Sequence, residues 1–305
     1  MKKLNISFEG VHDDTGYLFS FAKCLSAAMR NSPYSELAGD IIVTSGFGFR
    51  MWVDKTLCPS ATSIWHFYQQ KEWVENGGLT CAYVERLWGQ EDLEETRRQE
   101  ALEIIRKSID RGIAVVSWDI SGAEWGLITG YDEQAATLCI LKISGQEDTI
   151  DNTKLGNLEI PILSVLAITG KVQRTPEQLF QDTLRLAVNH LDGKEPGENP
   201  SGMAAYDQLL EILTNSYNQD MSWNLEYYLG TYAALKWYVA AYFRKYGKED
   251  LADLYERIWH CWSDAFYIKK DESKETEESI SAIIEKLKQA RNTEQEALNR
   301  MKELL

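Results

Sequence analysis

The sequence predicts an α+β protein, in which a mixed domain over residues 1–172 precedes an all-helical domain over residues 173–305. Strand-length apolar runs are clustered between residues 113 and 168, after a first stretch in which helical patterns dominate. Helices followed by clustered strands are typical of an α+β fold rather than of alternating βαβ units. At 305 residues the chain also exceeds the usual size of one hydrophobic core, which favours two domains.

The N-terminal part predicts a short edge strand and three helical stretches. Residues 4–8 alternate weakly between apolar and polar. An apolar run over residues 17–29 predicts a helix, and residues 13–15 supply acidic and hydroxyl side chains that can cap it. Residues 35–40 predict a short helix, and residues 60–76 predict another that ends at a pair of glycines.

Four strands and a long charged helix are predicted next. Residues 79–84 predict the first strand. Residues 92–110 predict a helix in which alanine, leucine and isoleucine form an apolar stripe while charged side chains cover the rest. Further strands are expected over residues 113–118, 137–143 and 162–168.

The central run, from Ser117 to Asp132, consists of two short apolar runs around a small polar bend. The second ends in Gly-Tyr-Asp, which is a turn signal. Glu124 is the ionisable residue that lies among apolar neighbours at the start of a strand. Desolvation by such neighbours would raise the pKa of its carboxyl, which suits a general base near neutral pH. A buried ion pair with Arg50 is the structural alternative.

The helical domain begins at residues 175–178, where Thr-Pro-Glu-Gln is a good helix start. A connection over residues 192–201, rich in Gly and Pro, interrupts the helical patterns. The helix over residues 223–246 is aromatic nearly all round, which is typical of a central helix. Helices over residues 254–268 and 276–305 follow, and the last has apolar spacings of four and three.

Composition and charge exclude several classes of partner and site. A formal net charge of −15 repels phosphate backbones and anionic lipids, so neither nucleic acid nor a membrane is expected as a partner. The five cysteines form no CxxC pair, which argues against a disulfide framework or a zinc site, and no cofactor is predicted. Without a signal-like or membrane-length apolar stretch, a cytoplasmic protein is expected.

Several short motifs resemble a known family. They are Gly-Val-His-Asp-Asp at residues 10–14, Leu-Ala-Gly at 37–39 leading into Ser-Gly-Phe-Gly-Phe-Arg-Met at 45–51, and Glu-Trp-Gly-Leu-Ile-Thr-Gly-Tyr-Asp at 124–132. These runs resemble the N-terminal domain of butirosin-biosynthesis protein H and its bacterial relatives, and residues 201–206 resemble the start of that family's helical C-terminal region. The resemblance implies a papain-like fold, with helices packed on an antiparallel sheet, and an acyltransferase or cysteine-peptidase-like activity.

The residues expected for papain-like catalysis are replaced in this sequence. Such enzymes hold a cysteine in the first turn of a helix, where the helix dipole and a strand-borne histidine lower the pKa of the thiol. Cys24 lies more than two turns beyond Thr15, too deep for the charge of the helix end to act. Glu124 stands at the histidine position, and residues 141–143 (Leu-Lys-Ile) replace the orienting residue. A degenerate site without peptidase activity is predicted.

Eight residues are candidates for the site. Catalysis would use Glu124 as the base, with Asp14 or a water as its partner and Cys24 as a candidate nucleophile. Cys24 also fits a small core residue, and the acids beside His12 also fit a capping turn. Ligand binding would fall to His12, Tyr17, Arg50, Trp118 and Trp125, of which Tyr17 and the two tryptophans could equally be core residues.

Three functions stay open on the sequence. The first is a degenerate papain-like protein whose cleft, between the helix after Thr15 and the Glu124 strand, binds a small molecule or peptide. The second is an active acyltransferase or amide hydrolase with Glu124 as base, and the resemblance implies an acyl-carrier-linked substrate for it. The third is a structural protein whose aromatic helices form a homodimer interface.

Overall fold

The computed structural model describes residues 1–62, 67–195, 197–271 and 276–305. It combines helices with an antiparallel sheet, which confirms the predicted α+β class. The chain divides into two compact units, and each contains several segments of the sequence. Unit 1 comprises Met1–Val11, Ser20–Ser45 and His66–Thr175, whereas unit 2 comprises His12–Phe19, Gly46–Trp65 and Pro176–Leu305.

The last change from one unit to the other, at Thr175, lies close to the predicted boundary at residue 172. Before that point, however, the chain contributes two segments to unit 2, His12–Phe19 and Gly46–Trp65. The predicted helices over residues 17–29 and 60–76 each run across an end of one of these segments, so a pattern-based boundary could not separate the segments from their neighbours.

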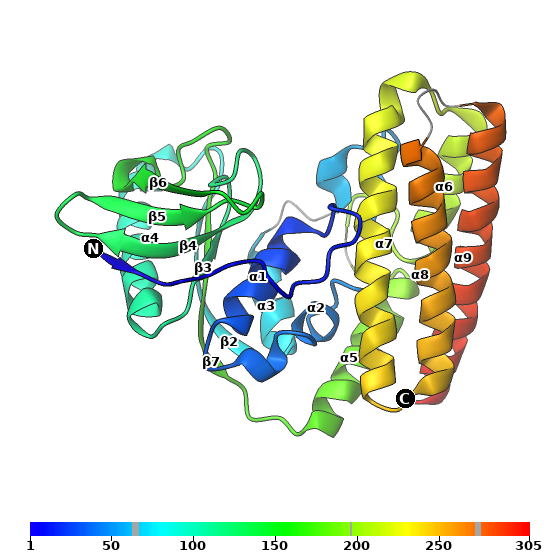
Figure 1. Cartoon of the computed structure of the whole chain (residues 1–305), viewed down its shortest axis with the longest axis horizontal. Helices are drawn as coiled ribbons and strands as arrows, with labels where there is room; N and C mark the ends of the chain where they lie inside the picture. Colours follow the sequence, from blue (N-terminus) through cyan, green and yellow to red (C-terminus); the bar gives the residue numbers. More distant parts are fainter. Residues whose placement is uncertain (63–66, 196, 272–275) are drawn as a thin grey trace. The chain divides into compact units, whose positions relative to one another are not determined.

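The sheet of unit 1 has the strand order β2-β7-β3-β4-β5-β6, and all its pairs are antiparallel (Figure 1). A seventh strand, β1, pairs with β4 at Tyr131 and Gly130. The strands are β1 (Lys2–Lys3), β2 (Leu79–Arg86), β3 (Val115–Ser117), β4 (Gly126–Asp132), β5 (Thr137–Leu141), β6 (Glu147–Asp151) and β7 (Leu163–Lys171). The four predicted strands and the second half of the central run correspond to β2, β3, β4, β5 and β7.

Two strands differ from the prediction. The N-terminal strand lies at residues 2–3 rather than at residues 4–8. The edge strand β6 lies in a stretch that the sequence predicts as a polar connection, because Glu147 and Asp148 face solvent and the strand has no apolar face. Their carboxylates form ion pairs of 2.7 Å with Lys3 and Lys142.

The helices of unit 1 are α1 (Ser20–Arg30), α2 (Ile41–Thr44), α3 (Tyr68–Asn76) and α4 (Glu94–Asp110). Helix α1 begins at Ser20, which corrects the predicted start near Thr15. Asp13, one of the residues expected to cap the helix, forms a turn instead. Asp13 Oδ1 accepts hydrogen bonds of 3.0 Å from the backbone N–H groups of Gly16 and Leu18. Of the helix predicted over residues 60–76, the structure has a 3₁₀ turn (Pro59–Thr62) and α3, and residues 63–66 lie outside the described ranges.

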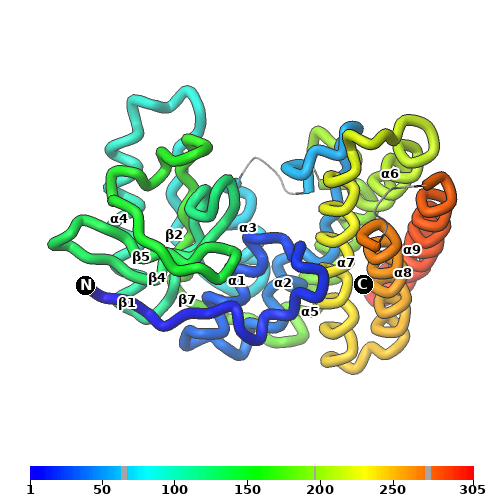
Figure 2. Tube along the Cα trace, turned by 45° about the horizontal axis from the view of Figure 1, so that its top comes forward, coloured from blue at the N-terminus to red at the C-terminus, as the bar shows by residue number. Residues whose placement is uncertain are grey.

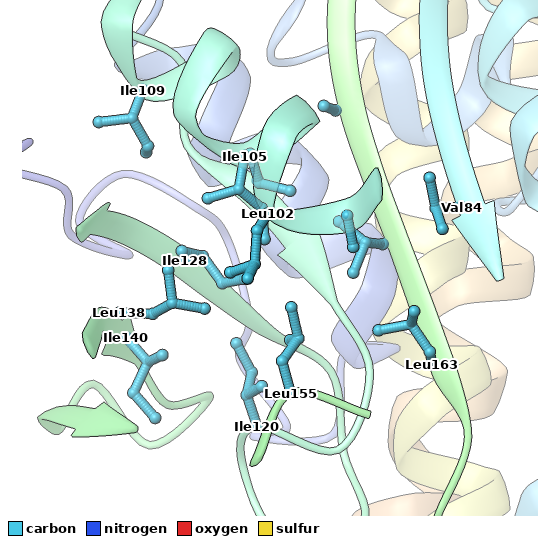
Figure 3. Close-up of a cluster of buried hydrophobic side chains, with 14 residues drawn as sticks. Val84, Leu102, Ile105, Ile109, Ile120, Ile128, Leu138, Ile140, Leu155 and Leu163 are labelled. Carbon is cyan, nitrogen blue, oxygen red and sulfur yellow. The ribbon is translucent and has the colours of Figure 1, made fainter. Parts of the chain in front are cut away.

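A hydrophobic core joins α4 to one face of the sheet (Figure 3). Leu102 and Ile105 of α4 pack with Ile128 of β4 and with Leu138 and Ile140 of β5. Side chains alternate across a strand, so the residues between these core positions point to the opposite face, and α1 packs against β3 and β4 without joining this core cluster.

Unit 2 contains α5 (Pro176–Leu191), α6 (Met203–Asn215), α7 (Ser222–Lys245), α8 (Glu249–Asp271) and α9 (Glu277–Glu303). Helices α7, α8 and α9 lie side by side (Figures 1 and 2). Most aromatic residues of α7 are buried, as predicted for a central helix. Across the described ranges, no helix has both the length and the apolar character needed to cross a membrane.

Glu294 interrupts the apolar spacing of α9, and its contacts explain why a carboxylate lies there. Its carboxylate is fully buried and accepts hydrogen bonds from Tyr206 (2.6 Å), Lys236 (2.5 Å) and Tyr255 (3.2 Å). Trp262 donates in turn to the hydroxyl of Tyr206 at 2.8 Å. The core of the helical bundle is therefore built around a paired buried charge, which must keep its partners because an unpaired charge is costly there.

Candidate functional site

A tight bend before β4 positions Glu124. The bend is held by Asp119, whose backbone has a φ of 61° and whose side chain is almost fully buried. Asp119 Oδ1 accepts from the N–H of Ala123 at 3.0 Å, and Oδ2 accepts from the N–H of Ile160 at 2.7 Å. These bonds fix the loop that leads into the strand. Asp119 was not among the predicted site residues, although an aspartate in a bend is a common signal for such a role.

Ser20 is the partner of Glu124. Its hydroxyl donates a hydrogen bond to Glu124 Oε2 from the first residue of α1. Burial raises the pKa of the Glu124 carboxyl, although the Ser20 hydroxyl and the N–H of Trp125 favour its charged form. The sequence instead predicts Asp14 or a water as the partner, and it places the helix start near Thr15, so Ser20 is not in the first turn of the predicted helix.

Cys24 lies one turn after Ser20 on the same face of α1 and has no exposed surface. Burial raises the pKa of its thiol far above the ordinary value; Lys23 opposes this shift, and Glu124 adds to it. The thiol therefore stays protonated. The charged groups that act on it are an ammonium and a carboxylate rather than an imidazole, so Cys24 lacks the activation that a nucleophilic cysteine needs.

Trp118 and Trp125 belong to a buried aromatic cluster. Phe67 lies 5.2 Å from Trp118 and 4.9 Å from Trp125 between ring centroids, and Phe21 of α1 lies 4.9 Å from Trp125. Trp125 is 1% exposed and Trp118 is 9% exposed. The sequence allows these two rings to line a cleft or to belong to the core, and their burial favours the core.

Arg50 forms its ion pair with Glu195, not with Glu124 as the structural alternative proposed. Its guanidinium donates to the Glu195 carboxylate from Nη2 at 2.7 Å and from Nε, which is shared between the two oxygens, at 3.0 and 3.2 Å. His190 Nδ1 lies 2.8 Å from the same carboxylate, and the N–H of Met51 donates to His190 Nε2 at 2.8 Å. The proton of the imidazole is therefore on Nδ1, which donates to Glu195.

The contacts of Arg50, His190 and Glu195 hold the segment around Met51 to the connection after α5. They do not form a catalytic dyad, because both ring nitrogens of His190 already make hydrogen bonds. Burial alone would raise the pKa of Glu195, but the hydrogen bond from His190 and the charge of Arg50 outweigh it and lower the pKa to about 2. Burial lowers the pKa of His190, which favours the neutral ring.

The other predicted residues of the N-terminal segment lie in unit 2. The ring of His12 stacks on Trp237 with 3.7 Å between centroids, and its Nε2 lies 3.8 Å from Asp14 Oδ1. The Tyr17 hydroxyl donates to Glu226 Oε1 at 2.8 Å. The eight candidates thus fall into two sets of four: Glu124, Cys24, Trp118 and Trp125 in unit 1, and His12, Asp14, Tyr17 and Arg50 in unit 2.

Neither protein-family models nor curated proteins give a match to this chain. Within the described residues, no three histidine, cysteine, aspartate or glutamate side chains are grouped so that they could hold a metal ion. The site is therefore defined by its own geometry: a hydroxyl in the first turn of a helix, a half-buried carboxyl at the start of a strand, and a protonated thiol one turn below.

Proposed function

We propose that unit 1 is a papain-like domain related to the butirosin-biosynthesis H family, and that it binds a small molecule or peptide without cleaving it. Ser20 and Glu124 would take the places of the thiol and the imidazole. The hydrogen bond between the helix-borne Ser20 and the strand-borne Glu124 carries this proposal, because it joins the two elements that a papain-like site requires. The antiparallel sheet with helices on it is compatible with that fold.

Loss of peptidase chemistry follows from the state of Cys24. A cysteine attacks as its thiolate, and burial together with the nearby carboxylate disfavours that form. A general base at the position of Glu124 would have to remove a proton from a thiol whose pKa is itself raised. The carboxyl of Glu124 therefore does not make up for the weak acidity of the Cys24 thiol.

Binding, in contrast, suits the pair. A carboxyl with a raised pKa can accept a hydrogen bond when charged and donate one when neutral, and the neighbouring hydroxyl can do both. This combination complements a carboxamide, which offers one acceptor and two donors. We therefore expect the ligand to present an amide group to Ser20 and Glu124.

The proposal is tested by following the Glu124 carboxyl directly. In protein labelled with ¹³Cδ-glutamate, the Glu124 resonance is identified by its loss in Glu124→Gln. Titration with short peptide amides should shift that resonance in the wild type, and the shift should be reduced in Ser20→Ala. The same peptides and acyl thioesters should show no turnover. Turnover that disappears in Cys24→Ser would overturn the proposal.

One observation favours a second candidate, acyl transfer with Ser20 as the nucleophile. The Ser20 O–H already points its proton at a carboxylate, which is the arrangement for general-base activation. Ser20 Oγ would attack the carbonyl of an acyl thioester while Glu124 takes the hydroxyl proton. The C–S bond would then break, and the leaving thiolate would receive that proton, leaving an acyl ester on Ser20.

Intact-protein mass spectrometry separates the two candidates. After incubation with an acyl thioester, acyl transfer requires an added acyl mass in the wild type and in Cys24→Ser, but not in Ser20→Ala. A binding protein shows no added mass in any of the three.

A further inference from the structure

A row of aromatic rings lies on unit 2. Trp223, Tyr227 and Gly230 lie on one face of α7, at spacings of four and three residues. Trp223 and Tyr227 have their ring centroids 5.6 Å apart, and Tyr17 meets Tyr227 edge to face at 5.7 Å. Trp223 is 58% exposed, so the outer end of the row is open to solvent.

The position of Tyr17 in this row is specified by its contacts. Its ring packs directly on Gly230, where an added Cβ would lie 2.7 Å from the ring. Thr15 Oγ1 donates to the carbonyl of Gly230 at 2.9 Å and fixes the same segment. The ring is thus held in place before any ligand binds.

A carboxylate lies within the row. Glu226 is half-buried and accepts the Tyr17 hydroxyl at 2.8 Å. In the described part of the chain, no lysine or arginine pairs with it, in contrast to Glu195 and Glu294. Burial, reinforced by the bond to Glu226, raises the pKa of Tyr17 to about 12, so the phenol keeps its proton and donates.

The next ring along the row has a cation over its own face. Phe266 meets Tyr17 edge to face at 5.7 Å, and the ammonium of Lys270 lies 5.2 Å from the centre of the Phe266 ring. An aromatic face attracts a cation through its quadrupole, most strongly for tryptophan. The faces of Trp223 and Tyr227 offer the same attraction beside a carboxylate.

We propose that Trp223, Tyr227, Tyr17 and Glu226 form a binding site for a quaternary ammonium group. The choice among cations follows from hydrogen bonding. A primary ammonium brings three N–H donors and a guanidinium five, and each needs an acceptor when water is removed. The site offers one carboxylate, which already accepts the Tyr17 hydroxyl. A quaternary ammonium has no N–H group to satisfy, and its methyl groups fit aromatic faces.

Choline is the probe, and 3,3-dimethyl-1-butanol is its matched uncharged analogue. The full chain is labelled with 5-fluorotryptophan, and the Trp223 resonance is identified by its loss in Trp223→Phe. Choline should shift that resonance saturably at constant ionic strength, with the neutral analogue and ethanolamine each weaker by roughly tenfold. Glu226→Gln, which keeps an acceptor for Tyr17 but removes the charge, should weaken choline binding by a similar factor.

Trp88→Ala is the control variant, because Trp88 is 56% exposed, on unit 1, and lies outside the row. It should leave choline binding unchanged. Equal binding of choline and its neutral analogue would show an apolar surface rather than a cation site. An unshifted Trp223 resonance at tens of millimolar choline, or binding that survives in Trp223→Ala, would overturn the proposal.

Discussion

The carboxyl of Glu124 makes a testable contribution to the pH dependence of stability. Burial raises its pKa above the ordinary 4.5, so the folded chain binds this proton more tightly than the unfolded chain does. The stabilisation is present in full below the ordinary value and is lost as the pH rises through the raised value. Glu124→Gln should therefore flatten the stability profile above pH 4.5 and unfold at an equal or higher temperature at pH 7.

Thermal unfolding followed by circular dichroism at a series of pH values measures this effect. Ser20→Ala is the matched control, because it removes a donor that favours the charged carboxylate and should steepen the loss of stability as the pH rises. A clear drop in the unfolding temperature of Glu124→Gln at pH 7 would mean that the ionised carboxylate stabilises the fold, contrary to a raised pKa.

The sequence singles out Glu124 as a candidate but not its hydrogen-bond partner Ser20, for a physical reason. Residues 13–15 contain three side chains that can cap a helix, and nothing local distinguishes a helix cap from a turn. In the structure Asp13 is used in a turn, and α1 begins at Ser20. That shift moves Cys24 from the third turn of the predicted helix to the second turn of the actual one, one turn after Ser20, whose hydroxyl contacts Glu124.

At the scale of elements, the contact between α7 and the Tyr17 segment depends on Gly230. A glycine inside a helix normally costs about 1 kcal/mol relative to alanine. Here the added methyl would meet the Tyr17 ring at 2.7 Å, so Gly230→Ala should instead destabilise the protein by about 1–3 kcal/mol. Urea unfolding measures the free energy of each variant.

A double-mutant cycle isolates that contact. With Tyr17→Ala as the background, the space over Gly230 is vacated, and Gly230→Ala should become stabilising by up to about 1 kcal/mol. If Gly230→Ala has the same effect in both backgrounds, its cost comes from elsewhere in α7 and the steric account fails.

The sequence predicts the elements that bury many apolar residues, and it does not predict those that are mostly polar or irregular. Helix α4 buries an apolar stripe, and β2, β5 and β7 are apolar runs of strand length whose residues are mostly buried, so local sequence patterns predict all four. Strand β6 is exposed along nearly its whole length, and the segment His12–Phe19 is held by individual hydrogen bonds and ring contacts. Such contacts depend on residues far away in the sequence, which no local pattern encodes.

For the molecule as a whole, the division into units means that two N-terminal segments, His12–Phe19 and Gly46–Trp65, pack with helices α5–α9 and supply partners for their buried polar groups. Arg50 neutralises Glu195, and the N–H of Met51 occupies His190 Nε2. The Tyr232 hydroxyl donates to the carbonyl of Trp52 at 2.7 Å, and an isolated bridge pairs Trp52 with Ser201. A chain cut at the predicted domain boundary would remove all of these partners from the helical part.

We expect residues 176–305, expressed alone, to keep helix but lose fixed packing. Without residues 1–175, Glu195 and His190 still pair with each other, but the carboxylate loses Arg50 and His190 Nε2 loses the N–H of Met51. Each loss costs roughly 1–3 kcal/mol while the group stays buried. The fragment should show far-ultraviolet dichroism of a helical protein, weak near-ultraviolet dichroism, and binding of a hydrophobic dye. Co-expression of residues 1–175, which restores both missing segments, should return the near-ultraviolet signal. A fragment that alone unfolds as cooperatively as the full chain would contradict the assignment of His12–Phe19 and Gly46–Trp65 to unit 2.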